Sequence, residues 1–154
     1  MQQEGLEAHG QASHGGRERS AIVNGRAISK EERERGTRFA PVFDASGLIP
    51  AVVVDAGTGE VLVLAWMNAE ALAKTRESGR VTFWSRSRGE LWTKGETSGN
   101  FLEVEEMLVD CDQDSLVIRA RPHGPTCHTG EKSCFYRRID PGADDAEALS
   151  PIER

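Results

Sequence analysis

The sequence has no long apolar run and no leader-like start. None of its hydrophobic segments approaches the ~18 consecutive apolar residues that define a membrane-spanning helix. The first residues, MQQEGLEAHGQASHGG, contain no apolar segment of the kind found in signal peptides. The chain has 154 residues, of which 38% are hydrophobic and 29% are charged. We therefore expect a single cytoplasmic domain that has no membrane partner.

Cysteine is scarce as well. The chain has 3 cysteines, Cys111, Cys127 and Cys134. An odd number of cysteines without a leader favours a reducing compartment and argues against a disulfide framework. At least one thiol must then have another role.

The sequence also lacks an excess of positive charge. Its formal net charge of −6 argues against a non-specific nucleic-acid binder, which would normally be basic. The charges are unevenly placed, because residues 80–100 are rich in Arg and Lys whereas residues 102–114 contain six acidic side chains and no basic one. This pattern suits a phosphate-bearing ligand beside bound cations, and it equally suits two solvated faces of a sheet.

The remaining pattern predicts two helices and several short strands. Residues 28–36 form a short helix, with Ser29 and Glu32 as a capping box, and residues 68–79 form the main helix between Asn68 and Gly79. Strands are predicted in LIPAVVVD, EVLVLAWM, RVTFWS, ELWTK, FLEVEEMLVDCD, SLVIRARP and CFYRRI. The expected fold class is α+β, a largely antiparallel β-sheet with one main helix in a single domain.

We expect three regions along the chain. Residues 1–38 are a flexible N-terminal extension with a possible short helix, and within it residues 1–20 have the composition of a mobile tail. Residues 39–138 form the domain proper. Residues 139–154 form an acidic C-terminal tail.

The stretch DCDQD supplies three carboxylates at alternate positions, Asp110, Asp112 and Asp114. On an extended strand these side chains point to one face and Cys111 points to the other. A calcium loop of the EF-hand type is excluded, because its sixth and twelfth positions would be Ser115 and Arg121 instead of Gly and Glu. A magnesium site and a solvated acidic turn both stay open at this point.

The stretch GPTCHTGEKSC supplies Cys127 and Cys134 in a loop that can fold back on itself. Together with Cys111 these cysteines offer three thiolates, whereas a closed structural zinc site needs four ligands. His128 or His123 could provide the fourth ligand, which gives a closed site. Alternatively the fourth position belongs to water, which zinc acidifies to a pKa of about 7. A small disulfide loop is a third alternative that the expected compartment disfavours.

Residues 85–100, SRSRGELWTKGETSGN, are dense in groups that hold phosphate. Neither GxxxxGK[ST] nor GxGxxG is present, so the segment is not a known nucleotide loop. Trp84 and Trp92 are expected to fill the core rather than to stack on a base. The predicted substrate-binding residues are Arg86, Arg88, Lys94, Ser98 and Asn100.

Taken together, LAWMN, FWSRSRGELWTKGETSGN, DCDQD and GPTCHTG…SCF resemble the phosphoribosyl-AMP cyclohydrolase family over residues 39–137. The resemblance implies a hydrolase of histidine biosynthesis that opens the N1–C6 bond of the adenine ring in 1-(5-phosphoribosyl)-AMP. It also implies one zinc ion per subunit on Cys111, Cys127 and Cys134, and magnesium on Asp110, Asp112 and Asp114. The implied functional unit is a homodimer whose zinc ligands come from both chains.

Within this interpretation His128 is the expected proton shuttle, because it adjoins a zinc ligand and histidine titrates near neutrality. Two other functions make different predictions for the sequence. A zinc nucleobase deaminase predicts H-x-E and P-C-x-x-C, and neither occurs in the chain. A structural zinc-binding interaction module predicts a closed site and gives the aspartates no role.

Overall fold

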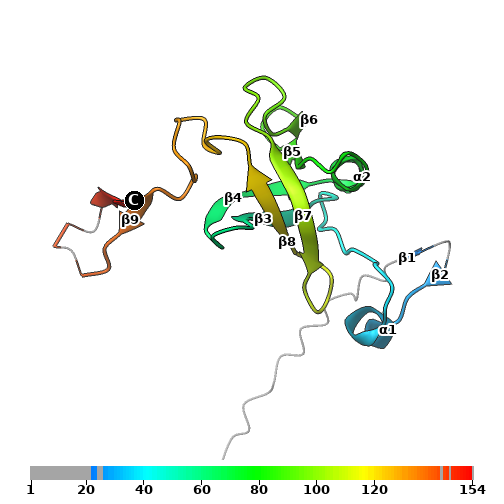
Figure 1. Cartoon of the computed structure of the whole chain (residues 1–154). Coiled ribbons are helices and arrows are strands. Elements are labelled where there is room, and N and C mark those ends of the chain that lie inside the picture. Colours follow the sequence, from blue (N-terminus) through cyan, green and yellow to red (C-terminus); the bar gives the residue numbers. More distant parts are fainter. Residues whose placement is uncertain (1–21, 24–25, 143, 146, 154) are drawn as a thin grey trace, which may run out of the picture.

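The computed structural model describes residues 22–23, 26–142, 144–145 and 147–153. The mobile tail predicted for residues 1–20 lies outside the described residues. Figure 1 shows a curled six-stranded sheet with helix α2 beside it. In spatial order the strands are β6 (Glu90–Thr93), β5 (Thr82–Ser85), β4 (Val61–Met67), β3 (Ile49–Asp55), β8 (Leu116–Pro122) and β7 (Leu102–Val109).

All neighbouring strands of this sheet are antiparallel except β3 and β8, which are parallel. The sheet curls far enough for the segment before β5 to reach β7. Val81 N–H donates to Leu102 O over 3.0 Å, and Val104 N–H donates to Gly79 O over 2.8 Å. The predicted α+β class with a largely antiparallel sheet is therefore confirmed.

Alternating burial explains why β3 lies inside the sheet. Ile49, Ala51 and Val53 are fully buried, whereas the residues between them are half-buried on the other face. The core that this face covers is apolar. Its largest members are Phe83, Ile49, Leu62, Met67, Leu102 and Ile118.

Helix α2 (Ala69–Ser78) is defined by its two caps. Asn68 accepts a hydrogen bond from Ala71 N–H over 2.8 Å, and Gly79 ends the helix in a left-handed conformation with φ 69°. The buried Thr75 hydroxyl joins the helix to the sheet. It donates to Ala71 O over 2.8 Å and accepts from Thr82 N–H over 2.9 Å.

The short helix α1 (Lys30–Arg35) begins at Ser29, where both hydrogen bonds of the predicted capping box form, and it ends at Gly36. It follows a small antiparallel pair, β1 (Ile22–Val23) and β2 (Arg26–Ala27), which the sequence did not indicate. Both predicted helices are therefore confirmed at their ends.

Two strand predictions need correction. Strand β7 ends at Val109, three residues before the end of FLEVEEMLVDCD, because Asp110 begins a turn that reverses the chain into β8. The last predicted strand begins only at Arg137, as β9 (Arg137–Ile139), and it pairs with β10 (Leu149–Pro151) in the acidic C-terminal segment. No helix in the described part of the chain combines the length and the apolar character needed to cross a membrane.

Candidate metal and substrate site

The loop after β8 brings two of the three cysteines together. Backbone hydrogen bonds from Cys127 N to Glu131 O (3.0 Å) and from Gly130 N to Cys127 O (3.0 Å) fold the loop back on itself. Cys134 N then donates to Leu62 O over 2.8 Å, which fixes the far arm of the loop against β4.

The buried Ser133 strengthens this attachment. Its hydroxyl donates to Val61 O over 2.7 Å and accepts from Phe135 N–H over 2.8 Å. Cys134 is therefore held in place by its own hydrogen bond to β4 and by the hydrogen bonds of the neighbouring Ser133. Sequence reasoning missed Ser133, because nothing in its pattern distinguishes it from an exposed loop serine.

The two sulfurs form an electrostatic unit. Burial acts against ionisation of Cys127, but hydrogen bonds from Thr129 and from the Cys134 thiol lower its pKa overall. The Thr129 hydroxyl donates to Cys127 Sγ over 3.0 Å. Loss of hydration and the neighbouring Cys127 raise the pKa of Cys134 to about 11. A bound metal ion would take both sulfurs as thiolates, and two adjacent cysteines provide such a pair.

Lys94 lies beside this pair, with only 7% of its surface exposed. Burial lowers the pKa of Lys94, and the two sulfurs act in the opposite direction. Its Nζ is 3.5 Å from Asn100 O. Lys94 therefore lies close enough to the cysteine pair to balance negative charge there.

The cysteine pair opens into a hollow of about 410 Å³. Asn100, which lines this hollow, packs tightly against Gly124 (φ 137°). A Cβ at position 124 would overlap the Asn100 side chain. The hollow brings together half of the twelve predicted site residues. Its lining includes Trp92, Lys94, Ser98, Asn100, Cys127, His128 and Cys134.

Arg86 and Arg88 lie at a neighbouring hollow of about 430 Å³, which Trp92 also lines. The Arg86 guanidinium lies 3.7 Å from the ring centroid of Trp66, and Arg88 pairs with Glu90 over 3.1 Å. Trp92 is 37% exposed, so the prediction that it fills the core was wrong. It is the wall between the two hollows.

The three aspartates also come together, although the predicted extended strand is absent there. Their ligand oxygens lie within 4.8 Å of one another on the exposed turn between β7 and β8. The turn is closed by Asp110, whose carboxylate accepts from Asp114 N–H over 3.0 Å and from the Ser115 hydroxyl over 2.6 Å. We call residues 110–115 the acidic turn.

Crowding of negative charge is visible in the acidic turn. Burial and the neighbouring carboxylates Asp110 and Asp112 raise the pKa of Asp114, and Arg33 opposes them. Although burial acts against it, hydrogen bonds from Ser115 and Asp114 lower the pKa of Asp110. A divalent cation would relieve this repulsion, and carboxylates are the ligands that magnesium prefers. The turn is therefore suited to hold a metal ion.

Cys111 lies on the acidic turn and is exposed, whereas the cysteine pair follows the opposite end of β8. A strand of 7 residues separates these ends, which is about 20 Å at the usual rise per residue. Among the described residues, the three aspartates are also the only group of three or more potential ligands. One chain therefore does not bring all three sulfurs to one ion.

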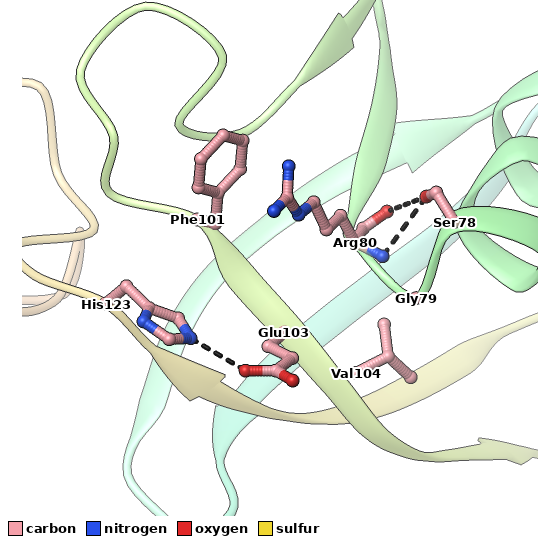
Figure 2. Close-up of a pocket in the computed structure, with 7 residues that line it drawn as sticks. All are labelled: Ser78, Gly79, Arg80, Phe101, Glu103, Val104 and His123. Atoms are coloured by element: carbon pink, nitrogen blue, oxygen red, sulfur yellow. Dashed lines mark hydrogen bonds and ion pairs between the residues drawn. The ribbon is translucent and has the colours of Figure 1, made fainter.

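A further hollow, of about 370 Å³, is lined by Ser78, Gly79, Arg80, Phe101, Glu103, Val104 and His123 (Figure 2). His123 hydrogen-bonds there to Glu103 over 2.8 Å, and this bond is the main reason that the pKa of Glu103 is lowered. The Arg80 guanidinium lies 4.0 Å from the ring centroid of Phe101. His123 thus lies with Glu103 and not at the cysteine pair.

Comparisons with known proteins agree on one family. The model of the phosphoribosyl-AMP cyclohydrolase family matches residues 63–136. A protein of that name from Rhizorhabdus wittichii is 62% identical over 110 residues, which cover 71% of this chain and 89% of the relative. Proteins of the same name from Hyphomonas neptunium and Sphingopyxis alaskensis are 58% and 55% identical, over 75% and 76% of this chain and 88% and 98% of the relatives.

Thr129→Val is expected to weaken zinc binding about three- to tenfold, because it removes a hydrogen bond to an ionised sulfur. The measurement is competition with a chromogenic chelator. Thr126→Val is the matched control, since the buried Thr126 hydroxyl has no hydrogen-bond partner among the described residues. Equal zinc affinity in the two variants would contradict the role given to Thr129.

Proposed function

This chain belongs to the phosphoribosyl-AMP cyclohydrolase family, and from that membership we propose that it opens the adenine ring of 1-(5-phosphoribosyl)-AMP by hydrolysis of the N1–C6 bond in histidine biosynthesis. Members of this family are enzymes that act on a C–N bond, so the alternative of a structural zinc-binding module was wrong. The missing H-x-E and P-C-x-x-C motifs leave the deaminase alternative without support.

The observation that carries the proposal is the pair of adjoining hollows on either side of Trp92. One contains the cysteine pair, His128 and Lys94, and the other is bordered by Arg86 and Arg88. A nucleotide with two phosphates needs cationic groups at a distance from the reacting ring. The proposed arrangement places the ring at the sulfurs, with phosphate at the arginines.

We assign the soft ligands to zinc and the hard ligands to magnesium. Cys127 and Cys134 would hold zinc together with Cys111 of the partner subunit, and Asp110, Asp112 and Asp114 would hold magnesium. Zinc held there would supply an acidified water as the nucleophile. The donor chemistry fits both ions, because a bound cation would stabilise the two adjacent sulfurs and would relieve the repulsion among the three carboxylates.

The chain's own residues then bind the substrate and move the proton. Alkylation at N1 makes the adenine ring cationic, so C6 is electrophilic. Water oxygen adds to C6, the C6–N1 bond breaks and N1 takes a proton. His128 lines the hollow beside Cys127 and is the group proposed to carry that proton. Ser98 and Asn100 line the same hollow as neutral hydrogen-bonding groups.

A homodimer is proposed because the zinc ligand set is incomplete in one chain. Exposed apolar side chains on the sheet support it, since contiguous apolar surface commonly marks an interface. Those on the strands of the large sheet are Val61, Leu64, Trp92, Leu108, Val109 and Val117.

A cytoplasmic location and the division of the chain into regions at residues 38 and 138 remain predictions.

The direct test is ring opening of phosphoribosyl-AMP by the purified protein, with and without a zinc chelator. Cys127→Ser and Cys134→Ser are expected to lose the bound zinc and at least about a hundredfold in activity. Zinc content is measured by atomic absorption on the same samples. Full ring opening by a protein stripped of zinc would exclude the proposed mechanism.

His128→Ala is expected to keep its zinc and to lose about 10²- to 10⁴-fold in rate, the usual contribution of a general acid–base group. Rate and zinc content are measured in parallel. A parallel fall of zinc content and rate would instead make His128 a metal ligand, which contradicts the open site.

A further inference from the structure

Gln113 is an unusual residue within the acidic turn. It lies between Asp112 and Asp114, which belong to an exposed cluster, and yet only 4% of its own surface is exposed. Its φ of 60° makes it the one non-glycine residue with positive φ in the described part of the chain. The left-handed conformation costs a non-glycine residue about 1–2 kcal/mol, so other interactions must hold Gln113 there.

Those interactions all reach the segment that precedes the sheet. Gln113 Nε2 donates to Arg33 O over 2.8 Å and to Arg38 O over 3.0 Å. Its Oε1 accepts from Ala40 N–H over 2.7 Å, and its backbone oxygen accepts from Val42 N–H over 2.8 Å. Both donors and the acceptor of the side-chain amide are thus used. We call residues 33–42 the docking segment.

The contact with Arg33 O also completes α1. The last carbonyls of a helix have no partner within the helix, and Gly36 N–H already takes the carbonyl of Glu32. Gln113 satisfies the next carbonyl and so fixes the end of α1 to the acidic turn, which lies beside it in Figure 1. The Arg33 side chain brings positive charge toward Asp114.

The three carboxylates of this turn lie within 4.8 Å of one another, and their mutual repulsion destabilises the closed turn. Hydrogen bonds within the turn run between residues 110 and 115, and they do not tie it to the rest of the protein. Gln113 provides that tie, because its buried amide bonds to backbone groups 73–80 positions away in sequence.

We propose that Gln113 is a positioning residue, which uses the docking segment to hold Asp110, Asp112 and Asp114 in the geometry that binds a divalent cation. The inference rests on the proposed function and gives part of the N-terminal region a role in it. Partners behind metal ligands commonly change metal affinity about 10–100-fold when they are removed. Coupling is reciprocal, so cation binding must in turn stabilise the contacts of Gln113.

The test is direct Mn²⁺ binding by the full-length, zinc-loaded protein, followed by electron paramagnetic resonance. Gln113→Ala is expected to weaken Mn²⁺ binding about 10–100-fold. Gln113→Gly is expected to weaken it as much, because glycine accepts the left-handed conformation but makes none of the side-chain contacts. Restored affinity in the glycine variant would show that backbone conformation alone matters and would overturn the proposal.

Thr75→Val is the control for stability. It removes a buried hydrogen-bonding hydroxyl from α2, outside the acidic turn, and is expected to destabilise the fold without changing Mn²⁺ affinity. An equal loss of Mn²⁺ affinity in Thr75→Val would reduce the role of Gln113 to general stability and overturn the proposal.

A second measurement uses the unchanged chain. Saturating Mg²⁺ is expected to slow amide hydrogen exchange at Ala40 and Val42, whose N–H groups bond to Gln113. Unchanged exchange at both amides would overturn the proposal even if the Gln113 variants failed to fold. Absence of ring opening in the wild-type protein would refute the proposed function instead, and the Mn²⁺ and exchange results would still decide the role of Gln113.

Discussion

The extended strand β8 is the constraint on which the site depends. It is hydrogen-bonded to β3 on one side and to β7 on the other, and this pairing keeps it extended. Cys111 precedes this strand and Cys127 follows it. The two residues are only 16 positions apart in sequence, but the strand holds them at opposite ends of the sheet. A metal site that uses both must therefore be assembled from two chains.

Both ends of the strand carry groups that a cation can bind. At one end the pKa of Cys127 is lowered, that of Cys134 is raised to about 11, and Lys94 lies beside them. At the other end burial and the neighbouring carboxylates of Asp110 and Asp112 raise the pKa of Asp114. The donor atoms differ, since sulfur suits a soft ion and carboxylate oxygen suits a hard one. The chain therefore offers soft ligands at one end of β8 and hard ligands at the other.

Much of the local structure follows from sequence signals that act over a few residues. Asn68 and Gly79 define α2, and Ser29 with Glu32 defines the start of α1, because caps satisfy specific backbone groups. Residues that belong to the two hollows were also identified from the stretches that carry them.

Local sequence patterns did not predict the interactions between distant segments. Alternation predicted that the aspartates share one face of a strand, whereas the structure gathers them by a turn that depends on the left-handed Gln113. No local pattern indicates that this glutamine bonds to Arg33, Arg38 and Ala40. Trp92 was predicted to lie in the core because strand tryptophans commonly pack inside, but it is 37% exposed and lines both hollows.

Mixing of two inactive variants tests the two-chain site most directly. Cys111→Ser and Cys127→Ser chains are co-refolded with zinc in equal amounts, and ring opening is compared with that of each variant alone. Half of the dimers are then mixed and each has one complete ligand set, so the account predicts about a quarter of the wild-type activity. A mixture as inactive as its parents would contradict it, because ligands supplied within one chain leave no complete site in any mixed dimer.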